Sequence, residues 1–520
     1  MIDPRAKSLG RRGFLKWSAL AVGATTVPIL QACGGAAPTA TAVPKPAEAP
    51  KPAAPAPAAP APKPPEAAKP AAAAPTATPA PSQTVVQAVA ALQKPKSNAK
   101  ITGKLQILQN QDFHPDHNAF VRLLLEEWGK AQNWQMDVSY IAGFQGGSDL
   151  NQKLVAMVQA GTPPDLMDHS VSHKQQTFLG VIEDVTALVK ENEAAHGKSV
   201  VGIQRAAEYD GKWWGVPYYT RAGGYYIRND WFKDAGVSPD TELNTYNKMR
   251  DVALRISDPD KKRWGWGMTV NRSGDGESIV KNLIWAHGGR FQDKTGQLIT
   301  LNTAETVAGY EWLKETYIDP KWAKALPPGV NAWNDISNNE AFLAGTLGIT
   351  QNAGTMLAKA YFDKVPHAET IGFVQTPFSL DGKGPRCESG GGETLRILKG
   401  TKNRDAANDT IKFWTSTPVQ QTIWKISTSY ALPAYDKGWD DPIIKGNKIS
   451  STFKAVVNNE DWWGDATPGP IQAAMDAVSV SNMFTDTMGE VIKGKPVKQA
   501  VEEMHKRAVK IYKEFGLKGE

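Results

Sequence analysis

Residues 209–230 read YDGKWWGVPYYTRAGGYYIRND, and this stretch decides the fold. The Asp-Gly pair at 210–211 has the chemistry of a tight hairpin turn, because glycine accepts a positive φ and aspartate can bond its own backbone. The chain should therefore return as a strand over Trp213–Pro217. A second strand, rich in β-forming aromatics, is predicted at Tyr225–Ile227. Two strands joined by tyrosines, one arginine and two glycines predict a crossover between two lobes.

The chain before this stretch alternates strand and helix. Ligands of parallel α/β sheets bind beyond the carboxyl ends of the strands, where the loops after the first and third predicted strands both lie. Gln111, Asp112, Asp168 and His169 are therefore candidate ligand-binding residues. The predicted elements are strands at 105–108, 136–140 and 165–167, a helix capped by Asp116, and a helix at 150–159.

The same periodicities continue after the crossover. Helices are predicted at 243–256, 279–286, 303–317, 405–415 and 497–512, and strands at 265–268, 347–350 and 394–397. The sequence therefore predicts an α/β protein with two lobes, which its 520 residues are long enough to build.

Three strings carry a family resemblance. DGKWWGVPY and YYIRNDWF around the crossover, and NNEAFLAGTLGIT at 338–350, resemble the hinge segments of family 1 extracellular solute-binding proteins of ABC importers, the maltose-binding type. The resemblance runs from about residue 104 to 512. It implies a periplasmic-binding-protein-like fold, with a mixed sheet flanked by helices in each lobe. The N-terminal lobe would comprise 99–219 and 353–416, and the C-terminal lobe 220–352 and 417–520.

The resemblance also implies a function. A monomeric receptor outside the cytoplasm would capture a solute, expected to be a carbohydrate, between its lobes and deliver it to the permease subunits of an ABC importer. Such a receptor has no catalytic residues, and we predict no cofactor and no metal. Two alternatives stay open: a secreted carbohydrate-active enzyme, which needs a carboxylate pair, and a solute-sensing module for a membrane sensor.

The basic charge of the chain belongs to its first 100 residues. They hold 12 of the 59 Lys and Arg but only 3 of the 53 Asp and Glu, so the remainder is slightly acidic. Nothing in that remainder favours nucleic acid as a partner.

The N-terminus has the pattern of an export signal. Arg11-Arg12, followed by Phe-Leu-Lys and a short apolar run, resembles a twin-arginine signal, although Gly10 replaces the usual serine. LQAC at 30–33 resembles a lipobox despite Gln31, which predicts a signal peptide over 1–33 and a lipid on Cys33. A plain cleaved signal is the alternative. Residues 34–98, rich in Ala and Pro, are predicted to be a disordered tether from the membrane.

The sequence motifs of phosphate-binding, catalytic and metal sites are incomplete or missing. Gly197-Lys198-Ser199 lacks the earlier glycine of a phosphate-binding loop, and no G-x-S-x-G or H-E-x-x-H motif occurs. His114 and His117 flank Pro115, which keeps them off one helical face, so we expect a polar loop and helix cap rather than a metal site.

A sugar site needs planar hydrogen-bonding groups together with stacking aromatics. Arg221 lies where the maltose-binding type, by resemblance, has an acidic residue facing the sugar. It either contacts the ligand or pairs with a cleft carboxylate such as Asp112 or Asp168. Phe484 aligns by resemblance with a stacking aromatic. The further candidates are Tyr219, Trp285, Asn352, Trp462 and Trp463.

Overall fold

The computed structural model describes residues 81–520 except for short gaps. Those gaps are residues 112, 143–146, 170–172, 378–379, 381–385, 387–389, 428–429, 448 and 460–463. The predictions for the signal peptide, Cys33 and most of the tether lie outside the described residues.

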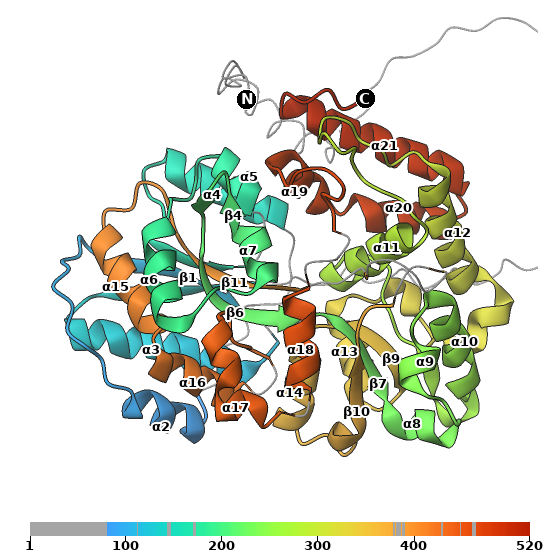
Figure 1. The fold of residues 1–520 in the computed structure, drawn as a ribbon, viewed down its shortest axis with the longest axis horizontal. Coiled ribbons are helices and arrows are strands. Elements are labelled where there is room, and N and C mark those ends of the chain that lie inside the picture. Colours follow the sequence, from blue (N-terminus) through green and yellow to red (C-terminus); the bar gives the residue numbers. More distant parts are fainter. Residues whose placement is uncertain are drawn as a thin grey trace, which may run out of the picture. The chain divides into compact units, whose positions relative to one another are not determined.

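The N-terminal lobe is built on a five-stranded mixed sheet of order β2-β1-β3-β11-β6 (Figure 1). The first three strands of the chain are parallel, and β11 runs antiparallel between β3 and β6. The strand order confirms the predicted parallel start of the sheet. The strands are β1 (Leu105–Gln111), β2 (Met136–Ala142), β3 (Leu166–His169), β6 (Val216–Ala222) and β11 (Gly390–Ile397).

Helices cover this sheet and complete its core. They are α2 (Gln83–Ala91), α3 (Pro115–Gln132), α4 (Gly147–Gln159), α5 (His173–Phe178), α6 (Thr186–His196), α7 (Val201–Ala207), α15 (Arg404–Trp414), α16 (Thr417–Ile426), α17 (Pro442–Lys445) and α18 (Ser450–Val457).

The start of α3 differs from the prediction by two residues. Its N-cap is His114, whose side chain accepts a hydrogen bond from the His117 amide, and not Asp116. Pro115 explains the shift, because a proline without an N–H and with φ near −65° suits the first helical position. The expected helix cap is thus confirmed at His114.

The C-terminal lobe has a four-stranded sheet of order β10-β7-β9-β8. Its strands are β7 (Gly224–Arg228), β8 (Trp264–Trp266), β9 (Leu347–Asn352) and β10 (Ile371–Val374). Its helices are α8 (Asn229–Asp234), α9 (Pro239–Glu242), α10 (Tyr246–Ile256), α11 (Gly274–Ala286), α12 (Ala304–Ile318), α13 (Asp335–Leu343), α14 (Thr355–Phe362), α19 (Ala473–Ser479), α20 (Met483–Ile492) and α21 (Val497–Glu514).

The hairpin and crossover lie as predicted, with one correction. β4 (Glu208–Tyr209) and β5 (Lys212–Trp213) are joined through a turn with positive φ at Asp210 and Gly211. The next strand does not end at Pro217. It continues to Ala222 because β11 supplies hydrogen-bonding partners along its length.

The chain crosses between the sheets three times, so two predicted boundaries are wrong. Residues 353–374 belong to the C-terminal lobe, because β10 pairs with β7 and α14 packs beside it. Residues 417–457 belong to the N-terminal lobe, where Val419, Ile423 and Phe453 are buried in its core. The crossings run from β6 to β7, from β10 to β11 and from α18 to α19.

The end of the predicted tether is also corrected. Residues 81–98, which we call the clasp, contain α2, and its Val85 and Val89 are buried against the N-terminal lobe. The chain after α2 is tied to two helices. Gln132 of α3 accepts from the Ser97 amide at 2.9 Å and donates to Pro95 at 2.9 Å, and Ser97 donates to Asp409 of α15 at 2.5 Å. A few well-spaced apolar residues therefore suffice to fold this segment.

Substitutions in α2 test whether this helix packs against the N-terminal lobe. Val85→Ala or Val89→Ala is expected to lower the free energy of unfolding by about 1–3 kcal/mol, because each removes two buried methyl groups and leaves a cavity. Val86→Ala is the matched control, since Val86 is 39% exposed, and should change it by less than about 0.5 kcal/mol. Chemical denaturation measures the free energy of unfolding of all three variants. Equal losses in the three would contradict the packing of α2 against the N-terminal lobe.

Candidate functional site

Polar side chains gather where the strands of the N-terminal sheet end beside the crossover. β1 ends at Gln111, which is exposed, and β3 ends at Asp168 and His169, which are buried. β6 leads from this edge into β7 within two residues, and Asn352 of β9 pairs with Gly224 at the start of β7. The crossover thus brings candidates from both lobes to one region.

Arg221 of β6 pairs with Glu393 of the neighbouring strand β11. The arginine side chain is 20% exposed, whereas the glutamate is fully buried. Of the two alternatives for Arg221, pairing with a carboxylate is what the structure shows. This partner, Glu393, is a carboxylate that the sequence analysis did not name, 172 positions along the chain; Asp112 lies outside the described residues.

A second arginine, in the same strand as Glu393, is fully buried. Arg396 of β11 donates to the His169 carbonyl at 2.7 Å and to Gln176 of α5 at 2.5 Å. Its guanidinium also lies 3.4 Å from the ring of His173. Burial lowers the pKa of Arg396 to about 10, so it stays charged at neutral pH.

The histidines at this site are neutral. Burial, and then the charge of Arg396, lowers the pKa of His169 to about 3. The same two causes hold the pKa of His173 well below its ordinary value. Burial and then His114 do so for His117. Neutral imidazoles offer one donor and one acceptor each, which suits hydroxyl groups.

An aromatic cluster borders the arginine. Tyr219 of β6 and Tyr430 place their hydroxyls 2.9 Å apart, and both rings lie against His117. The guanidinium of Arg221 lies 5.9 Å from the Tyr219 ring centre. Tyr219 is only 1% exposed, so its ring is buried beside Arg221.

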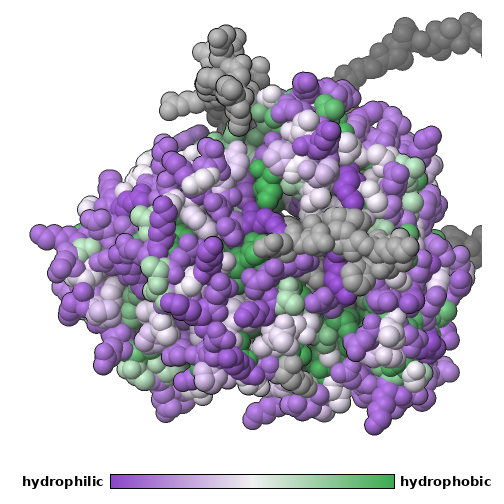
Figure 2. Space-filling model, in the orientation of Figure 1, coloured by the Kyte–Doolittle hydropathy of each residue, from purple (hydrophilic) through white to green (hydrophobic). Residues whose placement is uncertain are grey.

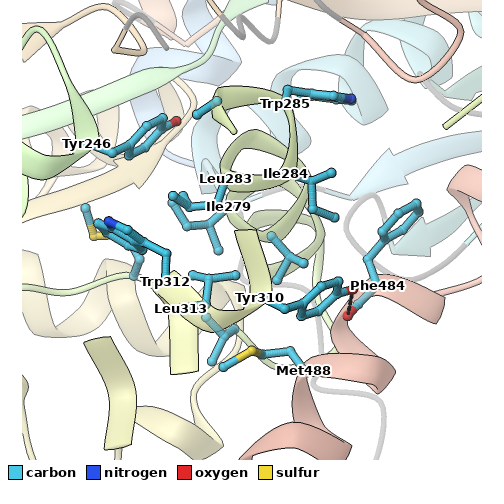
Figure 3. Packing of buried hydrophobic residues seen from close by; sticks show 14 of the residues in the cluster. Tyr246, Ile279, Leu283, Ile284, Trp285, Tyr310, Trp312, Leu313, Phe484 and Met488 are labelled. Carbon is cyan, nitrogen blue, oxygen red and sulfur yellow. Dashed lines mark hydrogen bonds between the residues drawn. The ribbon is translucent and has the colours of Figure 1, made fainter. Parts of the chain in front are cut away.

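The C-terminal candidates lie deeper in their lobe. Asn352 donates to Asp275 of α11 at 3.0 Å and also bonds Asn339. The ring centre of Trp285 lies 5.2 Å from that of Phe291, which in turn lies 4.6 Å from that of Phe484. Figure 3 shows Trp285 and Phe484 among the buried hydrophobic side chains. Both candidate rings belong to the C-terminal core, with Phe484 fully buried. Asp112, Trp462 and Trp463 lie outside the described residues.

Three site residues were missed from sequence: Glu393, Arg396 and His173. The available signal was the presence of two charged residues, Glu393 and Arg396, in the otherwise uncharged strand Gly390–Ile397. Buried charges of this kind require partners and therefore mark a polar site.

The two lobes also touch away from the crossover, at a contact we call the rim contact. Asp476 of α19 accepts from the backbone amides of Lys174 at 2.9 Å and Gln175 at 3.3 Å, at the start of α5. The rings of Phe178 and Phe515 lie 4.7 Å apart. Burial lowers the pKa of Lys174 to about 8. The surface on the face shown is mostly hydrophilic, with apolar residues in small separate patches (Figure 2).

Two other features, a metal-binding cluster and a membrane-spanning helix, are absent from the described part of the chain. It has no group of three or more His, Cys, Asp and Glu side chains arranged to hold a metal ion. It also has no helix that is both long enough and apolar enough to cross a membrane.

A two-lobed α/β fold with polar residues beside its crossovers defines the class of binding proteins that enclose a ligand between lobes. The family model described as bacterial extracellular solute-binding protein matches residues 115–421, more than half of the chain. The chain therefore belongs to the bacterial extracellular solute-binding protein family.

Two curated relatives are similar in sequence. The maltotriose-binding protein of Pyrococcus abyssi is 22% identical over 321 residues, which are 61% of this chain and 64% of the relative. The mannitol-binding protein of Pseudomonas aeruginosa is 27% identical over 180 residues, 34% of this chain and 39% of the relative. The chain thus matches less than two thirds of either relative's length.

Solved structures share the fold. Maltose-bound MalE3 of T. maritima superposes with a TM-score of 0.65 at 18% identity, covering 78% of this chain and 99% of that one. A solute-binding protein from Agrobacterium vitis with bound D-mannitol gives 0.66 at 18% identity, covering 80% and 100%. These likenesses confirm the predicted two-lobed fold.

Proposed function

We propose that this protein is the extracytoplasmic receptor of an ABC importer and captures a carbohydrate or polyol between its lobes. The observation that carries the proposal is the polar edge of the N-terminal sheet, where Arg221, Gln111 and His169 meet the crossover. Guanidinium, amide and imidazole groups are the planar hydrogen-bonding partners that hydroxyls require. Family membership and the sugar- and polyol-binding relatives support this reading.

The ligand would act by favouring the closed arrangement of the lobes. A ligand shifts such an equilibrium only through tighter binding to one state. Groups from both lobes meet at the crossover, and the rim contact supplies a second point at which the lobes can engage. The candidates Tyr219, Asn352, Trp285, Phe484, Asp168, Asp112, Trp462 and Trp463 remain part of this proposal.

Ligand binding is tested with the folded part of the chain, residues 81–520. Maltose, maltotriose, mannitol, ribitol and glucose are titrated by calorimetry, and the melting temperature is followed in parallel. A true ligand at a hundredfold excess over its Kd should stabilise the fold by about 2.7 kcal/mol. Tryptophan emission should also change as the lobes close.

The same experiment separates receptor from enzyme. Unchanged ligand recovered after prolonged incubation, with one molecule bound per chain, is expected of a receptor. Breakdown of maltotriose would favour a carbohydrate-active enzyme. A set of probes that leaves heat, melting temperature and emission all unaltered would contradict the carbohydrate proposal.

Anchoring belongs to the same proposal. Lipid on Cys33, after export by the twin-arginine route, would hold the receptor at the outer face of the membrane. Loss of membrane association in the Cys33→Ala variant, measured by fractionating cells, is the expected result, and a variant that fractionated like the parent would contradict lipid anchoring.

A further inference from the structure

We propose that the rim contact is a latch, in which Asp476 holds the two lobes together before a ligand arrives. A residue outside the candidate ligand site then helps to set the affinity. The inference rests on the proposed function and adds its regulation. In a receptor without such a contact the ligand has to supply the closing energy, because it shifts the equilibrium only through tighter binding to one state. A direct contact between the lobes adds closing energy that does not depend on the ligand.

One carboxylate oxygen of Asp476 joins the two lobes. Asp476 Oδ2 accepts from the backbone amide of Lys174 at 2.9 Å and from that of Gln175 at 3.3 Å. Figure 1 shows α5 and α19, which carry these residues, above the crossing from β6 to β7. Hydrogen bonds with an ionised partner are stronger than neutral ones, and they require a short distance. Both are therefore lost when α5 and α19 move apart.

Each end of the latch is fixed in its own lobe. In α19, Ala474, Met475 and Val478 are buried in the core of the C-terminal lobe. In α5, the Nε2 atom of His173 lies 2.7 Å from the hydroxyl of Thr394 in β11, a strand of the N-terminal sheet. A relative movement of the lobes therefore acts directly on the bonds of Asp476.

The side chain of Lys174 ties the amide that it carries to the N-terminal lobe. Its Nζ donates to the carbonyl of Arg205 at 2.6 Å and also to that of Ala206, at the end of α7. The charge of Lys174 acts across the lobes as well. Burial raises the pKa of Asp476, Lys174 and the two amides oppose this rise, and Asp465 adds to it. Lys174 thus stabilises the ionised form of the carboxylate that it faces.

An aromatic pair forms the second part of the latch. Phe178 ends α5, Phe515 follows α21, and their ring centres lie 4.7 Å apart. Phe178 remains 51% exposed despite this contact. A ring that is so exposed contributes little to the core of its own lobe, whereas its contact with Phe515 stabilises the engaged arrangement.

The distance between the lobes tests the latch without any ligand. Spin labels are placed on two exposed lysines, Lys153 of α4 and Lys498 of α21, which are changed to cysteine in the full chain with Cys33→Ser and Cys387→Ser. Pulsed electron paramagnetic resonance should give mainly one distance for this labelled parent. Asp476→Ala should shift the ratio of closed to open molecules at least tenfold toward the open form. Identical distance distributions in the two chains would overturn the proposal.

Asp293→Ala is the matched control. Asp293 Oδ1 accepts from the backbone amides of Gln297 and Leu298, each at 3.0 Å, so it makes the same kind of contact within the C-terminal lobe alone. This variant should leave the distance between the labels unchanged. A shift as large as that in Asp476→Ala would overturn the assignment to Asp476. Asp476→Asn retains an acceptor oxygen without the charge and should open the lobes less than Asp476→Ala does.

Phe178→Ala keeps the test decisive even if Asp476→Ala does not fold. Because the ring is half exposed, its removal should barely change the melting temperature but should raise the open population. Ile318→Ala is the control, since Ile318 is 45% exposed and lies at the end of α12, within the C-terminal lobe. Parent-like distances in Phe178→Ala, in the case where Asp476→Ala is unfolded, would also overturn the latch.

A carbohydrate that binds adds a quantitative check. When the ligand is held by the closed arrangement, the apparent Kd equals the Kd of that arrangement divided by its population in the free protein. The product of Kd and closed fraction should therefore be the same in the parent, Asp476→Ala and Phe178→Ala. A Kd that stays constant while the closed fraction falls would contradict the role of Asp476 in affinity.

The two measurements separate the latch from the proposed function. If none of the carbohydrate probes binds and Asp476→Ala still opens the lobes, the carbohydrate proposal fails and the latch stands. If a carbohydrate binds and Asp476→Ala keeps the distances of the parent, the function stands and the latch is refuted.

Discussion

Acidification from pH 7.5 to 5.5 is expected to lower the free energy of unfolding steeply, because His117, His169 and His173 are buried in the N-terminal lobe as neutral rings. Their pKa values are lowered in the folded state, that of His169 to about 3, whereas the unfolded chain titrates near 6.5. Below pH 6.5 the unfolded chain therefore binds protons that the folded chain does not. Stability is complete above that pH and is lost below it.

The size of the effect follows from the number of rings. Each histidine that stays neutral in the folded state costs about 1.4 kcal/mol per pH unit below 6.5, so three cost about 4 kcal/mol per unit. Asp476 and Glu277 act in the opposite direction, since burial raises the pKa of each carboxyl. Proton uptake by these two carboxyls on acidification therefore offsets part of the histidine effect.

Denaturant titrations at pH 7.5, 6.5 and 5.5 measure this slope. His169→Gln should reduce it by about a third, because one ring is removed. His196→Gln is a useful comparison, since that ring is only partly buried and should matter less. Stability that stays constant from pH 7.5 to 5.5 would show that the three histidines are protonated in the folded state.

Arg396→Met should be the most damaging single substitution at the site, with an expected loss of about 3–5 kcal/mol. Methionine keeps an unbranched apolar side chain but removes the guanidinium group and its charge. Gln176 and the His169 carbonyl would each lose one donor, and Glu393 would lose a nearby cation. Breaking a buried charge network from one side leaves the other side uncompensated, which is why the cost is large.

Arg404→Met provides the control for Arg396→Met. Arg404 pairs with Glu183, but its side chain is 44% exposed, so its removal should cost no more than about 1 kcal/mol. Chemical denaturation at pH 7.5 compares the two. Equal costs would mean that the Arg396 network contributes no more than an exposed ion pair.

Local elements were predictable from the sequence because their signals are local. The apolar pattern at 105–108 and the turn chemistry of Asp210-Gly211 gave β1 and the hairpin, and the resemblance placed the crossover. The assignment of 417–457 to a lobe was not predictable in this way. The apolar pattern of an amphipathic helix such as α16 indicates that one face is buried, but it does not indicate which sheet that face packs against.

The pairing of Arg221 with Glu393 could not be predicted from the sequence for the same reason. Arg221 and Glu393 are adjacent only because β6 and β11 are neighbours, and no local pattern in either strand names the other. α2 was missed because alanine and proline dominate the composition around it, whereas Val85, Val89 and Leu92 provide the packing. In each case tertiary contact decided what composition left open.

The clasp attaches the preceding chain to one of the two lobes. It is joined to α3 and α15, which belong to the N-terminal lobe, and its hydrogen bonds through Ser97 and Gln132 would be loaded together by a pull along the chain. Under the anchoring that we propose, a tether that enters at residue 81 would hold the N-terminal lobe in place. Closure would then move the C-terminal lobe, so a partner that senses closure from a fixed position would meet a moving C-terminal surface.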